Sequence, residues 1–360
     1  MDEKQLRIAV HEDEVILPSG QRQSFSDRWL ARGREAGYDM RRVDAFCDHF
    51  FDDLRGCDGF MWRFGYLPVP RLLAKRVLPA VEQGMQIPVF PDANTVWHFE
   101  DKIAQHLLLE GIGIPQPKTW VFWEQNEALG FCREATYPFV IKLAYGFRSS
   151  NVRLVRTFAE AKAWIDELFG PGLNSLAHSP ATPLGRYLRR ARAASRTLLG
   201  LRARGGADFS HGYLYVQEFL PDNTFDTRIA VIGERVFGFR RFNRDDDFRA
   251  SGSGRIDWDQ QAIDIEAVRL GFEIARRLRA QTVAIDVLKR GCEWVVGEIS
   301  YTGASWVLAN CPGHWRPVAA NGRLWFEWVE GMVHPEDAIF DDFVAQLQEF
   351  HVPAGNRYVG

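Results

Sequence analysis

The sequence is poor in lysine. Of its 44 basic side chains only seven are lysines, which leaves 37 arginines among 360 residues. Acidic residues number 47, so the formal net charge is −3 and no basic excess indicates nucleic-acid binding. A lysine ammonium is a compact point charge that a planar guanidinium does not replace at every anion site. Each position that keeps a lysine is therefore a candidate for a specific role.

Regularly spaced cysteines and long apolar segments are also missing. The five cysteines form no CxxC pair, which indicates reduced thiols rather than a disulfide framework or a zinc site. No apolar run approaches the ~20 residues that a membrane span needs. The N-terminus, MDEKQLRIAVHEDE, has acids where a secretory signal has positive charge followed by an apolar stretch. We therefore expect a cytoplasmic protein.

The chain does have enough apolar sequence for folded domains. It is 46% hydrophobic and 25% charged, which excludes a largely disordered chain, and its length favours two or three domains. The first part alternates between apolar strands, such as Arg7–Val10, and helices at Ser24–Ala36 and Arg71–Gln83, which predicts a parallel α/β sheet. Near the other end, Leu324–Phe350 is expected to be helical and irregular.

Lys142 lies in the apolar strand PFVIKLA, which leads into the turn Gly146–Asn151. An unpaired ammonium buried there is costly, so the lysine needs an anion or access to water. The turn contains a glycine, Ser149 and Ser150, and its backbone N–H groups can fold over phosphate oxygens. The alternative is a lysine that extends to solvent beside an ordinary hairpin.

Arginines and acids share the strands that follow. Asp226 and Arg228 are two residues apart, so both point to the same side of a strand, and Arg241 follows on the expected hairpin partner. Arg249 stands beside the Gly/Ser loop 251–254, a combination that suits an oxyanion. The alternative is a solvated face of salt bridges, which is common on antiparallel sheets.

Two further acids lie in apolar strands. Asp286 is flanked by Ile285 and Val287, while Glu298 and Ser300 share one face of the next strand. Carboxylates among apolar residues are rarely left unpaired. Two oxygen ligands together with nucleotide phosphates are a common way of holding Mg²⁺, and a buried pair to arginine is the alternative.

In chain order these segments resemble the ATP-grasp superfamily, and within it the ligases of the glutathione synthetase and RimK type. The resemblance covers roughly Thr95 to Gly303 and rests on DK at 101–102, FVIK at 139–142, QEFLP at 217–221, DxR at 226–228, ID at 285–286 and GE-S at 297–300. Residues 90–120 are also similar to ATP-grasp proteins of bacterial surface-polysaccharide loci. The resemblance implies an α/β protein in which two α+β lobes clamp ATP, preceded by a small Rossmann-like parallel α/β domain.

The resemblance also implies a division of the chain and roles for single residues. The expected parts are an N-terminal domain (1–94), a linking helix and connector (95–118), a lid lobe (119–220) with a basic insertion (168–207), a C-terminal lobe with the metal site (221–330) and a helical tail (331–360). Contacts with ATP are implied for Lys102, Lys142, Ser149, Ser150, the hinge residues Gln217, Glu218, Phe219 and Leu220, and Asp226 near the ribose. The implied catalytic residues are Arg228, Arg241 and Arg249. The implied Mg²⁺ ligands are Asp286, Glu298 and Ser300.

Two positions depart from the family pattern. The family usually has asparagine where this chain has Ser300, and a hydroxyl is a poorer Mg²⁺ ligand than an amide carbonyl, so one or two ions are expected. The phosphate-covering turn is usually rich in glycine, whereas GFRSSN has one.

The implied reaction joins a carboxylate to an amine or thiol. The carboxylate attacks the γ-phosphate to give an acyl-phosphate and ADP, and the nucleophile then expels phosphate. Because carboxylate and triphosphate are both anionic, Mg²⁺ and arginines must offset their repulsion. A small-molecule kinase that phosphorylates a hydroxyl and a nucleotide-binding protein without catalysis remain alternatives. The expected partners are small acid and amine substrates; sugar-linked substrates and a homodimer are further hypotheses.

Two features lie outside this scheme. Residues 168–207 contain no acid, and seven arginines fall between Arg186 and Arg204. A solvated insertion in the lid is the favoured interpretation; the alternative is a basic amphipathic helix at 183–204 that contacts anionic lipid or a polyanionic substrate. Several side chains near expected strand ends could contact substrate or a sugar: Trp62, Arg63, Tyr66, Trp306, His314 and Trp315. The alternative for the aromatic residues is that they belong to the hydrophobic core, which is the more common case.

Overall fold

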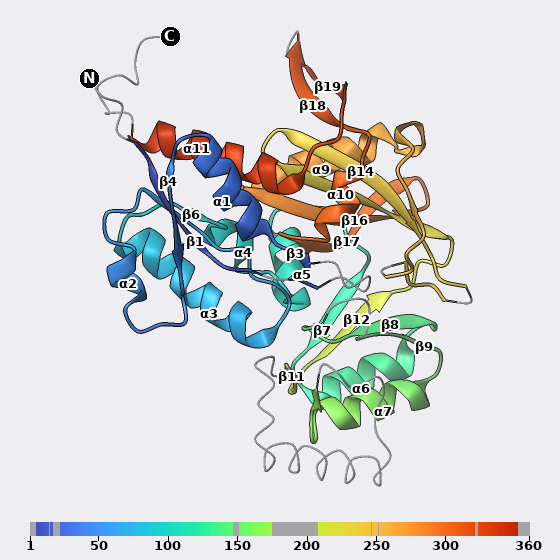
Figure 1. Ribbon diagram of the computed structural model, residues 1–360. Coiled ribbons are helices and arrows are strands. Elements are labelled where there is room, and N and C mark those ends of the chain that lie inside the picture. The colour runs from blue at the N-terminus through green and yellow to red at the C-terminus, as the bar shows by residue number, and fades with distance from the viewer. Residues whose placement is uncertain are drawn as a thin grey trace.

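The computed structural model describes residues 5–13, 15–16, 22–146, 151–174, 208–245, 247–250, 252–320 and 323–351. Ser149, Ser150, most of the basic insertion and the membrane-contact hypothesis for 183–204 therefore lie outside the described residues. The described part forms three units, each built around its own sheet (Figure 1).

The N-terminal domain (residues 5–92) is a parallel α/β unit, as the alternation of strands and helices predicts. Its strands run in the order β4 (Asp39–Val43), β1 (Arg7–His11), β5 (Gly59–Met61) and β6 (Val89–Phe90). Its helices are α1 (Phe25–Glu35), α2 (Phe50–Asp53) and α3 (Pro68–Pro79), which continues into a π-helical turn at Ala80–Gly84, and a short ribbon pairs β2 (Val15–Ile16) with β3 (Arg22–Gln23). Helix α1 begins where the Ser24 hydroxyl accepts the N–H of Asp27.

The lid lobe (residues 119–174 and 208–218) has an antiparallel sheet. Its strands run in the order β7 (Thr119–Phe122), β12 (Leu214–Glu218), β8 (Phe139–Lys142) and β9 (Val152–Val155). Helices α6 (Gln125–Glu134) and α7 (Phe158–Leu168) lie together below the sheet in Figure 1, and a short pair joins β10 (Leu173–Asn174) to β11 (Phe209–Ser210). The short α4 (Ala93–Val96) and helix α5 (Lys102–Gly111) connect this lobe to the N-terminal domain.

The C-terminal lobe (residues 225–330) has a larger antiparallel sheet. Its strands run in the order β17 (Glu293–Ser300), β16 (Thr282–Arg290), β13 (Phe225–Ile232), β14 (Arg235–Phe242), β18 (Gly313–Ala320) and β19 (Arg323–Glu330), and β15 (Ile256–Asp257) also pairs with β14. A 3₁₀ turn at Gln260–Ala262 precedes helix α9 (Ile265–Leu278), and α10 (Ser305–Ala309) follows β17. Helix α9 packs closely on β13 at Gly271. A Cβ atom at this position would lie 2.4 Å from Ile229 Cγ2, so the close approach requires a residue without a side chain.

The expectation of a helical and irregular stretch from Leu324 is wrong for its first residues. Arg323–Glu330 is the strand β19, which projects with β18 as a hairpin (Figure 1). The side chains alternate along this strand: Phe326 and Trp328 pack towards the lobe core, while Trp325 is 54% exposed. That period of two is the pattern of a half-buried strand.

Helix α11 (Pro335–His351) returns the chain to the N-terminal domain and packs along α1. Arg28 donates to both carboxylate oxygens of Asp337 at 2.7 Å, and the indole N–H of Trp29 donates to the Glu336 carbonyl at 2.9 Å. The end of the chain therefore closes one face of the first sheet and joins the N-terminal domain to the C-terminal lobe.

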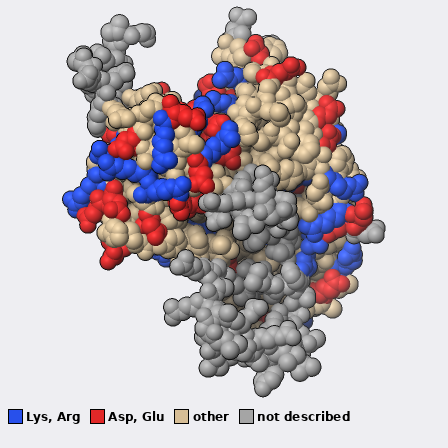
Figure 2. Space-filling view, viewed as in Figure 1, with Lys and Arg blue, Asp and Glu red and all other residues tan. Residues whose placement is uncertain are grey.

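The described surface carries both signs of charge. Figure 2 shows basic and acidic side chains interspersed on the visible face of the N-terminal domain. None of the helices in the described part of the chain combines the length and the apolar character that a membrane crossing requires.

Candidate active site

A cavity of about 1070 Å³ opens between the N-terminal domain and the C-terminal lobe. Five of the predicted catalytic and metal-binding residues line it: Arg228, Arg241, Asp286, Glu298 and Ser300. The strands β13, β14, β16 and β17 supply these five residues, so the cavity floor is the face of the C-terminal sheet.

The two lysines of interest converge on this floor from different elements. Lys102 is the first residue of α5, after the cap Asp101, and its Nζ lies 3.0 Å from Glu298 Oε1 and donates to the Gly146 carbonyl at 3.1 Å. Lys142 ends the lid strand β8, and its Nζ donates to the Gly297 carbonyl at 3.4 Å. Burial lowers the pKa of Lys142 to about 8, because the lobe interior solvates the ammonium poorly. The linking helix α5 and the lid thus place two ammonium groups beside the strand that carries Glu298.

The acids of the floor lie on adjacent strands. Asp286 of β16 is the register partner of Glu298 of β17, so both side chains rise from the same face of the sheet. Ser300 follows two residues later on that face, is buried, and its hydroxyl donates to the Thr302 carbonyl at 2.8 Å. Carboxylate and hydroxyl oxygens are hard donors, and this donor set fits Mg²⁺.

Arginines surround Asp286. Arg228 donates to its two oxygens at 2.6 and 2.8 Å, and Arg241 Nη2 lies 2.7 Å from Oδ2. Arg241 also donates to both oxygens of Asp226 at 2.7 Å. Burial raises the pKa of Asp286, but the charges of Arg228 and Arg241 outweigh burial and hold that pKa far below its usual range. The four side chains form a closed cluster of two cations and two anions.

The sequence is similar to known proteins over a limited stretch. No model of a known protein family matches the sequence. The carbamoyl phosphate synthase large chain of Thermus thermophilus is 32% identical over 98 residues, which is 27% of this chain and 9% of that protein. This chain therefore matches a small part of that larger relative.

Solved structures are similar over much more of the chain. A RimK domain ATP-grasp protein from Sphaerobacter thermophilus superposes with a TM-score of 0.55 at 16% identity, over 94% of this chain and 99% of that one. The ATP-grasp ligase PsnB gives 0.54 at 14%, over 95% and 99%. The N5-carboxyaminoimidazole ribonucleotide synthetase of Thermotoga maritima gives 0.52 at 12%, over 82% and 68%. The chain has the ATP-grasp fold.

Within the ATP-grasp fold the expected hinge joins the two lobes. Glu218 Oε1 accepts the backbone N–H of Lys118 at 2.9 Å and Nη1 of Arg290 at 3.3 Å. Gln217 Nε2 donates to the hydroxyl of Thr119 at 3.0 Å. The ring of Phe219 lies edge-on to Phe248, and the Leu220 carbonyl accepts from Asn223 at 3.4 Å. These contacts place the four residues at the crossing from β12 to β13, where the predicted adenine contact remains a prediction.

Two residues predicted to contact ATP or substrate have other contacts here. Asp226, predicted to lie near the ribose, pairs with Arg241; the pair is buried, whereas the salt-bridge alternative expected a solvated face. Arg249 is not among the residues that line the cavity; its Nε lies 2.9 Å from both oxygens of Asp247. Arg244, which the sequence did not single out, lines the cavity instead. Loop contacts such as Arg249–Asp247 leave no periodic signal in the sequence.

Glu100 is a further cavity residue that sequence reasoning missed. It directly precedes Asp101, it is 4% exposed, and within the described part of the chain its Oε2 has no hydrogen-bond partner. Burial raises its pKa to about 7, against the opposing charge of Lys102, and the charge of Glu298 adds to the rise. Its backbone has φ of 56°, a left-handed conformation that is uncommon for glutamate. The local sequence Phe99–Lys102 gives no indication that the Glu100 side chain is buried.

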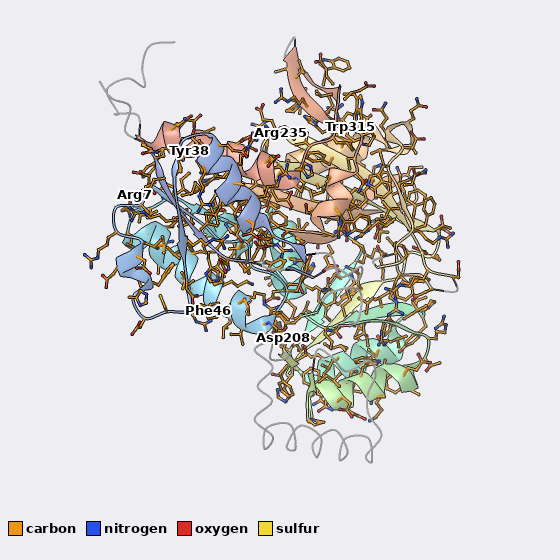
Figure 3. All side chains as sticks on the ribbon, in the orientation of Figure 1. Arg7, Tyr38, Phe46, Asp208, Arg235 and Trp315 are labelled. Carbon is orange, nitrogen blue, oxygen red and sulfur yellow. The ribbon has the colours of Figure 1, made fainter. Side chains whose placement is uncertain are left out.

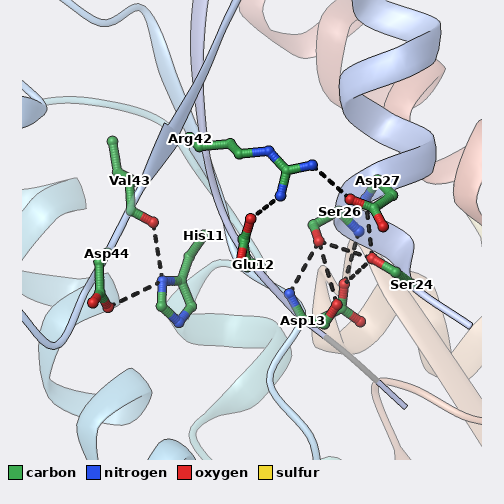
Figure 4. Close-up of polar contacts among 9 residues, drawn as sticks. All are labelled: His11, Glu12, Asp13, Ser24, Ser26, Asp27, Arg42, Val43 and Asp44. Atoms are coloured by element: carbon green, nitrogen blue, oxygen red, sulfur yellow. Dashed lines mark hydrogen bonds and ion pairs between the residues drawn. The ribbon is translucent and has the colours of Figure 1, made fainter. Parts of the chain in front are cut away.

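The N-terminal domain forms the opposite wall at the carboxyl ends of its parallel strands. Asp13, which follows β1, accepts the backbone N–H of Ser26 at 2.7 Å and the hydroxyl of Ser24 at 3.3 Å (Figure 4). Its other oxygen lies 3.8 Å from Arg63 Nη1, and Arg63 Nε donates to the Thr302 hydroxyl at 3.2 Å. A buried guanidinium from the first domain therefore contacts the loop that follows the metal-candidate strand β17.

The lid lobe also touches the N-terminal domain. Asp208, labelled beside the lid in Figure 3, forms an ion pair with Arg71 of α3, and both side chains are largely buried. The same figure places Phe46, a cavity-lining residue, on the lower edge of the first domain. Among the other aromatics singled out, Trp62, Tyr66 and Trp306 line the cavity, whereas His314 and Trp315 are buried and do not.

Proposed function

We propose that this protein is an ATP- and Mg²⁺-dependent ligase that joins a carboxylate to an amine or thiol through an acyl-phosphate, with release of ADP and phosphate. The observation that supports it most is the convergence of Lys102 and Lys142 on Glu298 at the edge of an arginine-lined cavity. Two ammonium groups and two guanidinium groups there can bind a polyphosphate and a second anion together.

The lysines are the proposed contacts for the nucleotide phosphates. Phosphate would relieve the poor solvation of the Lys142 ammonium and would replace the present contacts of Lys102 with Glu298 and Gly146. Asp286, Glu298 and Ser300 would hold Mg²⁺, which when bound offsets the negative charge of the phosphates and of the attacking carboxylate. The number of ions stays open because Ser300 offers only a hydroxyl.

The cavity beyond the metal-candidate residues is the proposed substrate pocket. Arg228 and Arg241 would stabilise the charge that develops on the transferred phosphoryl group. Arg63 offers a buried guanidinium to the acid substrate from the opposite wall. Trp306, which lines the cavity and is 39% exposed, is the aromatic best placed to stack on a sugar-linked substrate.

A trapping experiment tests the reaction class before the natural nucleophile is known. The protein is incubated with ATP, Mg²⁺, a panel of carboxylic acids and hydroxylamine, which captures an acyl-phosphate as a hydroxamate. Hydroxamate with equal amounts of ADP and phosphate supports the ligase. A stable phosphorylated product with no hydroxamate would instead indicate the kinase, which uses the same phosphate-binding residues.

A further inference from the structure

The cavity wall formed by the N-terminal domain carries a carboxylate oxygen without a hydrogen bond. Asp13 follows β1, and its side chain is 6% exposed. Within the described part of the chain, two buried carboxylate oxygens of cavity-lining residues have no hydrogen-bond partner, Glu100 Oε2 and Asp13 Oδ2. Glu100 lies two residues before Lys102, a proposed phosphate contact, whereas Asp13 belongs to the opposite wall. A buried acceptor without a donor costs free energy, so we expect a donor from outside at Asp13.

The rest of Asp13 is held in place by the start of α1. Its Oδ1 accepts the backbone N–H of Ser26 at 2.7 Å and the Ser24 hydroxyl at 3.3 Å (Figure 4). Its own backbone N–H donates to the Ser26 hydroxyl at 3.0 Å. A donor that bound Oδ2 would leave all of these contacts intact.

Asp13 is linked to the metal-candidate strand β17 through one arginine. Arg63 Nη1 lies 3.8 Å from Asp13 Oδ2, too far for a hydrogen bond, and Arg63 Nε donates to the Thr302 hydroxyl at 3.2 Å. The Thr302 carbonyl accepts from the Ser300 hydroxyl at 2.8 Å. A ligand at Asp13 would therefore be separated by one arginine and one threonine from Ser300, a candidate Mg²⁺ ligand.

The chemistry of Asp13 Oδ2 favours an amine as the donor. An amine has N–H groups that a carboxylate oxygen accepts, and its protonated form also offsets the negative charge. A thiol is a weak donor, and the carboxylate would repel the thiolate, which is the nucleophilic form. A divalent cation is disfavoured because the guanidinium of Arg63 lies 3.8 Å away and Oδ1 already accepts two hydrogen bonds.

We propose that Asp13 binds the nucleophile of the reaction, and that this nucleophile is an amine rather than a thiol. The assignment rests on the proposed function, because it assumes that an acyl-phosphate forms. The C–N bond forms as the C–O bond to phosphate breaks. Of the two protons that the ammonium loses, one leaves with the phosphate and one passes to solvent. Asp13 and Arg63 thus serve the two substrates side by side, the amine and the acid.

Competition with hydroxylamine tests the assignment before the natural amine is known. The protein is incubated with ATP, Mg²⁺, hydroxylamine and an acid that yields a hydroxamate. Ethanolamine or 2-mercaptoethanol, an amine and a thiol of similar size, is added in increasing amounts, and hydroxamate is measured per ADP released. A nucleophile that occupies the site diverts the acyl-phosphate and lowers this ratio.

The test variant is Asp13→Asn, which keeps an acceptor for Ser24 and Ser26 and replaces Oδ2 by an N–H donor. The matched control is Asp342→Asn. One oxygen of Asp342 accepts from Arg235 Nη1 at 2.8 Å, and the other has no hydrogen-bond partner among the described residues. Asp342 does not line the cavity, so it isolates the effect of position.

Ethanolamine is expected to lower the ratio at concentrations at which 2-mercaptoethanol does not. Asp13→Asn should require about tenfold more ethanolamine or more, and Asp342→Asn should match the wild type. The assignment is overturned if Asp13→Asn responds to ethanolamine as the wild type does, if ethanolamine has no effect on the wild type, or if the thiol is as effective as the amine. If Asp13→Asn does not fold, the comparison of amine with thiol in the wild type still decides the class of nucleophile. A wild-type protein that releases no ADP and yields no hydroxamate would refute the proposed function instead.

Discussion

Replacing Lys142 by methionine is expected to make the protein more stable and unable to bind ATP. Methionine has a similar length and no charge, so it keeps the packing of β8 and removes the buried ammonium. In the folded protein that ammonium donates one long hydrogen bond within the described residues, 3.4 Å to the Gly297 carbonyl, and burial lowers its pKa to about 8 from the ordinary 10.5. The charge therefore opposes folding until an anion arrives.

The magnitude follows from the pKa. A shift of about 2.5 units at about 1.4 kcal/mol per unit gives a penalty of about 3 kcal/mol for the charged lysine. The penalty is complete below pH 8, where the lysine is charged in both states, and it disappears above pH 10.5, where both states are neutral. Wild-type stability is therefore expected to rise between pH 8 and pH 10.5 through this group, and that of Lys142→Met is not.

Urea unfolding at pH 7 and pH 10.5, followed by circular dichroism, measures both effects. Lys142→Met should exceed the wild type by up to about 3 kcal/mol at pH 7, with the gap closing at pH 10.5. The control Lys162→Met removes a half-exposed lysine that pairs with Asp166 on α7, and it should change stability by less than about 1 kcal/mol. A Lys142→Met variant that is less stable than the wild type at pH 7 would refute the reasoning.

The remaining predictions concern the floor of the cavity and its support. Asp286→Asn leaves two buried guanidinium groups sharing Asp226, so thermal unfolding should show a loss of about 3–5 kcal/mol, and wild-type stability would contradict the cluster. Gly271→Ala drives a methyl group into Ile229, which should cost about 1–3 kcal/mol, whereas Gly84→Ala meets nothing within 4 Å and serves as the control. Glu298→Ala should nearly abolish acid-dependent ADP release while the circular dichroism spectrum stays that of the wild type; retained turnover would remove Glu298 from the site.

The spacing of apolar residues predicted the parallel sheet of the N-terminal domain but did not predict the hairpin of β18 and β19. Alternating apolar strands and helices near the N-terminus match elements that bury one face each, and this pattern is visible in any short window. Residues 324–329, LWFEWV, also alternate, but most of the six are large aromatic or aliphatic side chains, and Trp325 is exposed rather than polar. Because Trp325 is apolar but exposed, the alternation between buried and exposed positions is not visible as an alternation between apolar and polar residues.

Two candidate site residues could be picked out because lysine is rare in this chain. Lys102 and Lys142 stand out beside 37 arginines, and the structure brings Lys102 to Glu298 and Lys142 to the neighbouring Gly297 carbonyl. Glu100 could not be found this way, because a glutamate before a helix cap is ordinary in sequence. Its burial and its interactions depend on groups elsewhere in the chain, such as Arg71 and Glu298, which no local pattern brings to position 100.

The strands 226–241 carry a pattern of acids and arginines that has two interpretations, an anion site and a face of salt bridges. Register pairs Asp226 with Arg241 and Arg228 with Asp286, and the resulting ion pairs are buried rather than solvated. Such a neutral cluster attracts an incoming phosphate weakly, because each guanidinium already has a carboxylate partner. Among the described residues, the close contacts of the lysines are Glu298 and two backbone carbonyls, so the lysines carry the positive charge that an incoming anion can engage most easily. Phosphate binding is thus expected to begin at the lysines, and the arginines become available only as negative charge develops beside them. This order follows from the charge pairing of the folded chain, which residue spacing alone does not reveal.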